Sequence, residues 1–205
     1  MMDYPLGKIY AFDFDGTLTT RDTLLAFIRY VHGTWRMTCG FLRYLPQLVL
    51  MKCHLCPNWK AEQKIFTHFF AGMPLDTFND YCRRFAADNP ELLRPQGLAT
   101  LSHALDKGAQ VMVVSASIDN WVAPFFRHYQ SSHRLSIVGT RIEVIDGKVT
   151  GRFLTPNCYG PEKVRRMQEM LSEPRDHYRI TAYGDSRGDK EMLQYADERH
   201  YKPFR

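Results

Sequence analysis

Long apolar runs are missing from this sequence. No uninterrupted stretch approaches the roughly 20 residues that a membrane-spanning helix requires. The first ten residues lack the basic start and apolar middle of a secretory signal peptide. With 44% hydrophobic and 24% charged residues among 205, the composition excludes disordered, collagen-like and coiled-coil classes. We therefore expect a globular, cytoplasmic protein.

Cysteines are few and odd in number. The five are Cys39, Cys53, Cys56, Cys82 and Cys158. An odd count in a chain without an export signal argues against a disulfide framework. Cys53 and Cys56 form a single CxxC pair, whereas a zinc or redox site would need a second ligand pair or a thioredoxin-like strand, and neither is found. We interpret this pair as buried thiols, and a metal role for it stays open.

Acidic residues are scarce between residues 29 and 68. Glu62 is the only one there, against six lysines and arginines with aromatic residues between them. Such a segment suits an anionic partner: a phosphorylated substrate, a lipid surface or a nucleic acid. No nucleic-acid-binding motif accompanies the charge, so we do not expect a nucleic acid. Residues 40–52 are apolar with basic flanks, which favours packing in a helical core or, alternatively, peripheral contact with the anionic inner face of a membrane.

The hydrophobic pattern predicts an α/β fold. Residues 8–13 are typical of a buried strand, and residues 22–88 follow helical spacing in four stretches with a break near Pro46. From residue 95 onward helices and strands alternate, which predicts a Rossmann-like parallel sheet with helices on both faces. We expect a core of residues 1–19 and 93–205 with an all-helical insert of residues 20–92. The later elements are expected at 95–107, 110–115, 118–129, 135–139, a hairpin around Asp146–Gly147, a helix opened by Gly160–Pro161, 178–183 and 200–201.

Reactive side chains follow three of the predicted strands, at the strand ends where such sheets bind ligands. The segments are Asp13-Phe14-Asp15-Gly16-Thr17, Ser115, and Gly184-Asp185-Ser186-Arg187-Gly188-Asp189. Lys163 lies in the first turn of a predicted helix, where its charge opposes the helix dipole unless an anion is near. Each of these features alone is also consistent with a turn, a helix cap or a solvated lysine.

Together these features predict a metal and phosphoryl site. Asp13, Asp15, Asp185 and Asp189 would gather four carboxylates at one sheet edge, where like charges raise each other's pKa. A hard divalent cation with oxygen ligands, Mg²⁺, would offset that repulsion. A site with Mg²⁺, a lysine and a hydroxyl suits a phosphoryl group.

The ordered motifs resemble those of the haloacid dehalogenase superfamily of phosphatases. They are DFDGTLT at 13–19, VVSAS at 113–117, Lys163, and YGDSRGD at 183–189. The helical insert after the first motif is similar to the C1-type cap of the phosphoserine-phosphatase-like branch (subfamily IB), which also includes bacterial phosphatidylglycerophosphatases. The resemblance spans nearly the whole chain.

The resemblance implies a role for each catalytic position. Asp13 would attack phosphorus and form an aspartyl-phosphate, and Asp15 would act first as general acid and then as general base. Mg²⁺ would bind the Asp13 carboxylate, the Asp15 main-chain carbonyl and Asp185. Asp189 would hold a metal-bound water or Lys163.

The resemblance also implies a set of phosphate-binding groups. Ser115 and Lys163 would bind the phosphoryl oxygens, helped by the backbone amides of Phe14 and Ala116. Thr17 is expected to belong to this set and to orient Asp15 and the turn.

The insert is expected to select the substrate. Asp22 could contact a substrate amino group, as the resemblance implies, or cap the first helix of the insert, which we favour. The arginine that binds the substrate carboxylate in that branch has four candidates here: Arg29, Arg36, Arg43 and Lys60. We predict hydrolysis of a small, phosphoserine-like metabolite. The alternatives are a phospholipid head group such as phosphatidylglycerophosphate, phosphoryl transfer to a second alcohol, and a phosphate-binding module without catalysis.

Overall fold

The structure, a computed structural model, describes residues 7–52, 58–129 and 133–205, with the side chains of residues 45–52 and 58 excepted. Cys53 and Cys56 lie outside the described residues. None of the helices in the described ranges is long and apolar enough to cross a membrane.

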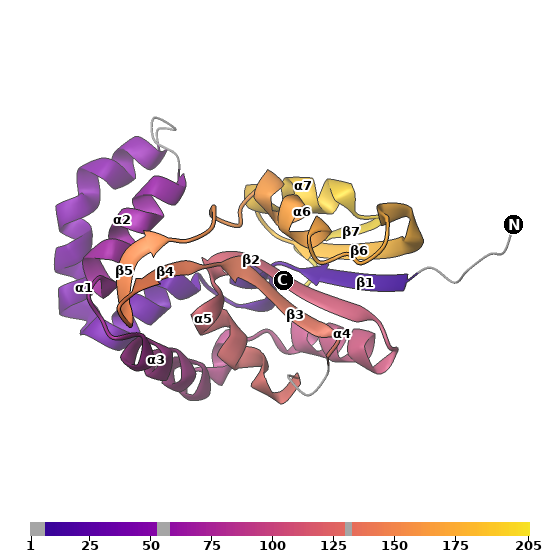
Figure 1. The fold of residues 1–205 in the computed structure, drawn as a ribbon, viewed down its shortest axis with the longest axis horizontal. Helices are drawn as coiled ribbons and strands as arrows, with labels where there is room; N and C mark the ends of the chain where they lie inside the picture. The colour runs from indigo at the N-terminus through magenta and orange to yellow at the C-terminus, as the bar shows by residue number, and fades with distance from the viewer. Residues whose placement is uncertain (1–6, 53–57, 130–132) are drawn as a thin grey trace, which may run out of the picture.

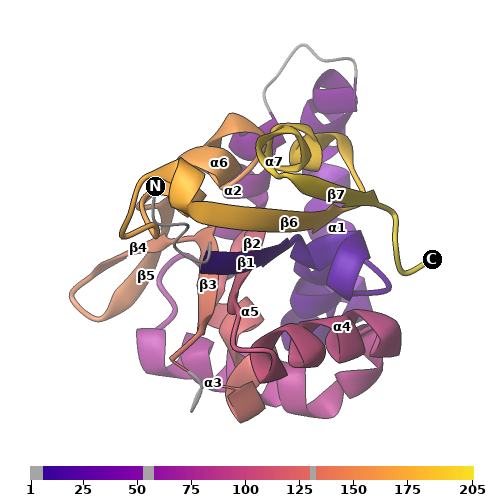
Figure 2. The same ribbon diagram turned by 90° about the vertical axis from the view of Figure 1, so that its right-hand side faces the viewer.

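A five-stranded parallel sheet forms the centre of the molecule, in the order β3-β2-β1-β6-β7 (Figures 1 and 2). The strands are β1 (Gly7–Phe12), β2 (Gln110–Ile118), β3 (Leu135–Thr140), β6 (Tyr178–Gly184) and β7 (Glu198–Tyr201). Phe12, the last residue of β1, is paired with Val113 on one side and with Tyr183 on the other. This register brings the segments that follow β1, β2 and β6 to one edge of the sheet.

Helices cover both faces of the sheet. Figure 2 shows α6 (Pro161–Gln168) and α7 (Lys190–Tyr195) on one face, and α4 (Pro95–Asp106) and α5 (Asp119–Val122) on the other. Successive strand residues point to opposite faces, so Met112 packs with α6 and α7 whereas Val111 and Val113 pack with α4 and α5. The predicted α/β class is confirmed, and the continuous apolar strands reflect burial on both faces.

The segment after β2 differs from the prediction. Strand β2 continues to Ile118, which pairs with Thr140 of β3 after a register shift. Helix α5 is therefore short, and a 3₁₀ helix (Ala123–Tyr129) follows it. The predicted hairpin is confirmed as β4 (Ile142–Ile145) and β5 (Lys148–Phe153), with Asp146 and Gly147 at its turn.

In the described residues the insert contains the four helical stretches predicted. They form α1 (Thr23–Lys52), which consists of two helices that meet in a kink at Gly33, α2 (Asn58–Phe70) and α3 (Leu75–Asp88). The expected break near Pro46 is wrong, because α1 continues past it, and the one non-helical residue of α1 is Gly33 (φ 77°). That left-handed conformation costs glycine little, since glycine has no Cβ.

The β4–β5 hairpin lies against the insert rather than the sheet (Figure 1). The hydroxyl of Thr67 on α2 donates to the carbonyl of Gly151 on β5, at 2.7 Å. Trp121, on α5, packs its ring against Phe27 and Phe66 of the insert. The insert and the sheet thus share one aromatic core, and the division into a core and a cap stays a prediction.

Candidate active site

The first reactive segment is fixed in a tight turn at the end of β1. The backbone N–H of Asp13 donates to the carbonyl of Tyr183 at 2.9 Å, which continues the pairing with β6. A helical turn (Phe14–Leu18) follows, with Gly16 at φ 80°. A Cβ at residue 16 would lie 2.7 Å from Oδ2 of Asp185. Only glycine therefore lets Asp185 come so close to this turn.

Lys163 lies at the centre of the site and is 2% exposed. Its Nζ donates to Oδ1 of Asp13 at 2.6 Å, to Oδ1 of Asp189 at 2.6 Å and to the carbonyl of Val114 at 2.9 Å. Three acceptors thus match the three donors of the ammonium group. The position near a helix start, unfavourable for an isolated lysine, is offset by two carboxylates.

Burial and the neighbouring charges act in opposite directions on the pKa values of Lys163, Asp13 and Asp189. Burial raises the pKa of Asp13 to about 7, although the charge of Lys163 acts against that rise. The carboxylates of Asp13 and Asp189 hold the pKa of Lys163 above its usual range. The charge of Lys163 holds the pKa of Asp189 below its usual range. In both cases desolvation acts in the opposite direction. Oδ2 of Asp13 is buried without a hydrogen-bond partner. One oxygen of Asp13 is thus held by the lysine while the other is free to bind a ligand.

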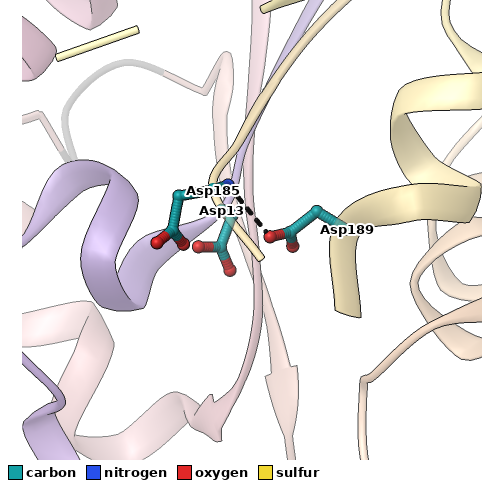
Figure 3. A group of neighbouring side chains, drawn as sticks. All are labelled: Asp13, Asp185 and Asp189. Carbon is teal, nitrogen blue, oxygen red and sulfur yellow. Dashed lines mark hydrogen bonds between the residues drawn. The ribbon is translucent and has the colours of Figure 1, made fainter. Parts of the chain in front are cut away.

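Asp189 is held firmly by the loop that follows β6 (Figure 3). Its Oδ2 accepts the N–H groups of Asp185 at 3.1 Å and Ser186 at 2.9 Å, and the Ser186 hydroxyl at 2.8 Å. With Lys163 on Oδ1, both oxygens are bonded to the protein. This arrangement suits a residue that positions Lys163 and the loop.

Asp185 contacts two residues from distant parts of the chain. The hydroxyl of Thr17 donates to its Oδ1 at 3.4 Å, and the guanidinium of Arg205 forms an ion pair with its Oδ2. Thr17 was expected to orient Asp15. The structure places its hydroxyl on Asp185 instead, because the turn at Gly16 brings Thr17 alongside the β6 loop.

The carboxylates of Asp13, Asp185 and Asp189 form the group that could hold a metal ion. One oxygen from each lies within 4.8 Å of the others (Figure 3). An all-oxygen, carboxylate-rich set with one unpartnered buried oxygen fits a hard cation such as Mg²⁺. The expected cluster of four carboxylates is corrected to three, because Asp15 turns its side chain elsewhere.

Asp15 is held by residues of β2 and α1. Its Oδ2 accepts the hydroxyl of Ser117 at 2.6 Å and that of Ser115 at 3.5 Å, and its Oδ1 accepts the N–H of Thr23 at 2.7 Å. Burial, with the charge of Asp22 second, raises its pKa to about 6. No role for Ser117 or Thr23 was predicted from the sequence. The signal for Ser117 was its spacing of two from Ser115, which puts both side chains on the same side of β2.

A cavity of about 240 Å³ opens beside these groups. Asp13, Asp15, Ser115, Ala116 and Lys163 line it from the sheet side. The insert contributes four lining residues: Asp22, Leu24, Glu62 and Phe66. The sheet edge and the insert therefore enclose the same space.

Asp22 contributes both to the start of α1 and to the cavity wall. Its Oδ1 accepts the N–H of Leu25 at 3.1 Å, so it caps α1 as favoured from the sequence. It also lines the cavity. By contrast, Arg29, Arg36, Arg43 and Lys60 are absent from the described lining, so none of these candidates reaches the cavity.

Glu62 was missed as a site residue. It lies on α2, and its Oε2 accepts the amide of Asn157 at 2.5 Å. Burial raises the pKa of Glu62 to about 7, and the charges of Asp22 and Asp15 act in the same direction. The hydrogen bond from Asn157 acts in the opposite direction. In the sequence it was visible only as the one acidic residue in a basic segment.

We expect Glu62→Gln to make the protein more stable at neutral pH. When the pKa of an acid is higher in the folded chain than in the unfolded chain, ionising that acid destabilises the folded state. The free energy of unfolding therefore falls as pH rises through the interval between the two pKa values. Here the interval runs from 4.5 to about 7, and the loss amounts to at most about 3 kcal/mol. Urea unfolding should show the variant's advantage growing from pH 4.5 to pH 8. The exposed Glu91→Gln should show no such trend, and a flat difference for Glu62→Gln would contradict its burial.

Comparisons with known proteins agree with this geometry. The haloacid dehalogenase-like hydrolase family matches residues 10–194. Protein CicA of Caulobacter vibrioides is 37% identical over 199 residues, which cover 96% of this chain and 86% of that protein. A protein of unknown function from Bordetella pertussis Tohama I has the same fold, with a TM-score of 0.80 at 19% identity over 95% of this chain and 89% of that chain.

A phosphoserine phosphatase, solved as an analogue of its phospho-aspartyl intermediate, has a TM-score of 0.58 at 18% identity over 95% of this chain and 85% of that chain. At these identities the solved structures establish the fold alone. The family match covers most of the chain, and the curated relative is matched along nearly the whole of it. This chain belongs to the haloacid dehalogenase-like hydrolase family.

Proposed function

We propose that this protein is a Mg²⁺-dependent phosphomonoesterase that works through an aspartyl-phosphate on Asp13. The observation that carries the proposal is Asp13 itself: a buried carboxylate with one oxygen held by Lys163 and the other without a partner. Asp15 lines the same cavity with a raised pKa. Membership of a hydrolase family and the fold shared with a phosphoserine phosphatase support the same chemistry.

In the first step the Asp13 carboxylate attacks phosphorus opposite the leaving oxygen. A bond forms between Asp13 and phosphorus while the bond from phosphorus to the ester oxygen breaks. Protonated Asp15 donates its proton to that oxygen, so an alcohol leaves. The pKa of about 6 supports this role, because it keeps a useful fraction of Asp15 protonated near neutral pH.

In the second step Asp15, now ionised, takes a proton from water while the water oxygen attacks phosphorus. The bond between Asp13 and phosphorus breaks, phosphate leaves and the Asp13 carboxylate is restored. The hydrogen bonds from Ser117 and Thr23 hold Asp15 in place for both steps.

Lys163 and Ser115 are the side chains placed to bind the phosphoryl oxygens. The backbone amides of Phe14 and Ala116, and Thr17, complete the proposed set. Asp13 and Asp185, with the Asp15 carbonyl, would hold Mg²⁺, and Asp189 would keep Lys163 and the loop in position. The cation would neutralise charge on the phosphoryl group.

We infer that residues 20–92 act as a cap of the kind found in the phosphoserine-phosphatase-like branch and select the substrate. The four insert residues in the cavity wall support this inference. The substrate would be a phosphate monoester of a small metabolite.

Phosphate release from nitrophenyl phosphate, with Mg²⁺ and with EDTA, tests the proposal. We expect turnover with Mg²⁺ and its loss in EDTA, with recovery on adding Mg²⁺ back. Phosphate that binds in calorimetry without any ester being hydrolysed would identify the non-catalytic alternative. A higher yield of a new ester on adding a second alcohol would identify a phosphotransferase.

One surface of the insert favours a second candidate function, a phosphatase of phospholipid head groups. On α1, Trp35 and Leu42 are 79% and 62% exposed and lie seven residues apart, on one side of the helix. Arg36 and Arg43 repeat the same spacing beside them and line a groove with His32 and His68. We propose that this face of α1, the Trp35–Arg43 face, rests on an anionic bilayer with its rings and methyl groups inserted.

We expect the protein to co-sediment with vesicles that contain anionic phosphatidylglycerol and to stay in solution with neutral phosphatidylcholine. The double variant Trp35→Ser, Leu42→Ser should reduce binding about tenfold, because each large apolar side chain contributes roughly 1.5–3 kcal/mol on burial and only part of that is realised at an interface. Leu154→Ser is the control, since Leu154 is 63% exposed outside the insert. Equal binding to both vesicle types would contradict the proposal.

A further inference from the structure

The cavity wall formed by the insert is acidic and aromatic. Asp22 precedes α1 and Glu62 lies on α2, and the rings of Phe66, Trp121 and Phe153 line the space around them. Among the described lining residues the only lysine or arginine is Lys163, at the opposite, catalytic end. The part of a substrate that lies against the insert therefore meets carboxylates and no fixed cation.

Glu62 is held in a defined position in this wall. Asn157 donates its side-chain amide to Oε2 at 2.5 Å. The hydroxyl oxygen of Thr140 lies 2.7 Å from the carbonyl oxygen of Ala116 and 3.3 Å from the side-chain oxygen of Asn157, and its single hydrogen can be donated to one of them at a time. Polar contacts thus run from Glu62 on the insert through Asn157 and Thr140 to Ala116 on β2. These contacts favour a fixed position of Glu62 relative to the end of β2.

The carboxylates of this wall repel one another. The charge of Asp22 raises the pKa of Glu62 and also that of Asp15, and the charge of Asp15 adds to the effect on Glu62. Lys163 lies at the other end of the cavity, beside Asp13 and Asp189, where Mg²⁺ would also be held. A cation on the leaving group would relieve this repulsion, whereas a neutral hydroxyl would leave it in place.

We propose that Glu62 binds a protonated amino group on the leaving group, beside the contact from Asp22 that the family resemblance implies, so that the preferred substrates are phosphate monoesters of amino alcohols that carry no carboxylate. This inference rests on the phosphatase function proposed above. It differs from the phosphoserine-like substrate expected from the sequence. The rings of Phe66 and Trp121 add a favourable surface for the ammonium group and its methylene carbons.

A leaving group with a carboxylate would be disfavoured in the same place. Phosphoserine carries both an ammonium and a carboxylate group. The cavity provides acidic partners for the first, whereas the described lining includes no arginine for the second. Phosphoserine is therefore expected to be a poorer substrate than the same compound without its carboxylate, which is phosphoethanolamine.

The experiment compares kcat/KM for matched esters in the presence of Mg²⁺. Phosphoethanolamine is paired with propyl phosphate, in which a methyl group replaces the ammonium, and aminopropyl phosphate is paired with butyl phosphate. We expect the amino ester to be preferred by about tenfold or more in at least one pair, the range expected for a charge-assisted contact. Phosphoserine should fall below phosphoethanolamine.

Two variants test the residues. For each variant the measured quantity is kcat/KM for the amino ester divided by kcat/KM for the matched alkyl ester. Glu62→Gln keeps the shape and the Asn157 contact but removes the charge, and should lower the ratio about tenfold. Asp22→Asn should also lower it while keeping the melting temperature, because asparagine caps helices as well as aspartate does. Glu91→Gln, at an exposed position, should leave the ratio as in the wild type.

Failure of this inference is distinguishable from failure of the proposed function. If nitrophenyl phosphate is hydrolysed but neither amino ester is preferred, the inference is overturned and the phosphatase function stands. A preference for phosphoserine, or for a phospholipid without an amine, would overturn it as well. If the preference is present but Glu62→Gln leaves the ratio unchanged, Glu62 is not the binding group. Loss of all turnover, nitrophenyl phosphate included, would refute the proposed function itself.

Discussion

Replacing Asp13 by asparagine is expected to abolish phosphate release. The side-chain amide cannot form the acyl phosphate, so kcat should fall by at least about 10⁴-fold, the scale seen when a covalent nucleophile is removed. The fold should survive, because asparagine has the same volume and Lys163 keeps its contacts with Asp189 and the Val114 carbonyl. Release of phosphate from nitrophenyl phosphate with saturating Mg²⁺ measures the effect.

Asp106→Asn is a matched control for this experiment. Asp106 is exposed at the end of α4, before β2, and therefore lies at the opposite edge of the sheet from Asp13. The control should retain wild-type turnover, and circular dichroism should show both variants folded. A folded Asp13→Asn protein that keeps a tenth of the wild-type activity would exclude Asp13 as the nucleophile.

Lys163→Met is expected to have the largest effect on stability. Methionine fills most of the space left by the lysine chain, but the buried Asp13 and Asp189 carboxylates lose their counter-charge. Removing one partner of a buried ion pair costs about 3–5 kcal/mol, because it leaves uncompensated charge in the interior. Urea unfolding in EDTA measures this loss, and turnover should be lost as well, because Lys163 is also proposed to bind the phosphoryl oxygens.

A second substitution separates lost charge balance from lost packing. Adding Asp189→Asn to Lys163→Met removes one of the stranded carboxylates, so the double variant should be more stable than the sum of the two single effects predicts. Lys190→Met, at an exposed position at the start of α7, is the matched control and should change stability by less than about 0.5 kcal/mol. A loss below about 1 kcal/mol for Lys163→Met would show that the three groups are not coupled as described.

The carboxylates that could hold a metal ion and the proposed general acid, Asp15, occupy separate positions around Asp13. The carboxylates of Asp185 and Asp189 lie with Asp13, whereas Ser117 and Thr23 turn the Asp15 carboxylate away from them. This separation has a chemical consequence. A carboxylate bound to a cation would have its pKa lowered and could not donate a proton near neutral pH, whereas Asp15 keeps a raised pKa.

The sequence by itself determined the parallel sheet and the strand ends that carry the reactive groups. The apolar runs at 9–12 and 111–114 are continuous because these strands are buried on both faces. Parallel pairing of these strands with the strand at 178–184 brings their carboxyl ends together. Asp13, Ser115, Asp185 and Asp189 could therefore be assigned to one edge from local pattern alone. The turn at Gly16 was equally local, since it depends on a backbone conformation that glycine favours.

Only the tertiary structure decided which side chains of the insert reach the cavity and which way Asp15 faces. Glu62 lies in a basic helix that is far from the motifs in sequence, and its position depends on how α2 packs on the β4–β5 hairpin and on Trp121. The direction of Asp15 depends on Ser117, about a hundred residues away, and on the N–H of Thr23. Contacts of this kind are set by packing between segments distant in sequence rather than by local periodicity. The reactive groups of the sheet edge, and Asp22, could thus be predicted from the sequence, whereas Glu62 could be recognised as a site residue only from the packing of the insert against the sheet edge.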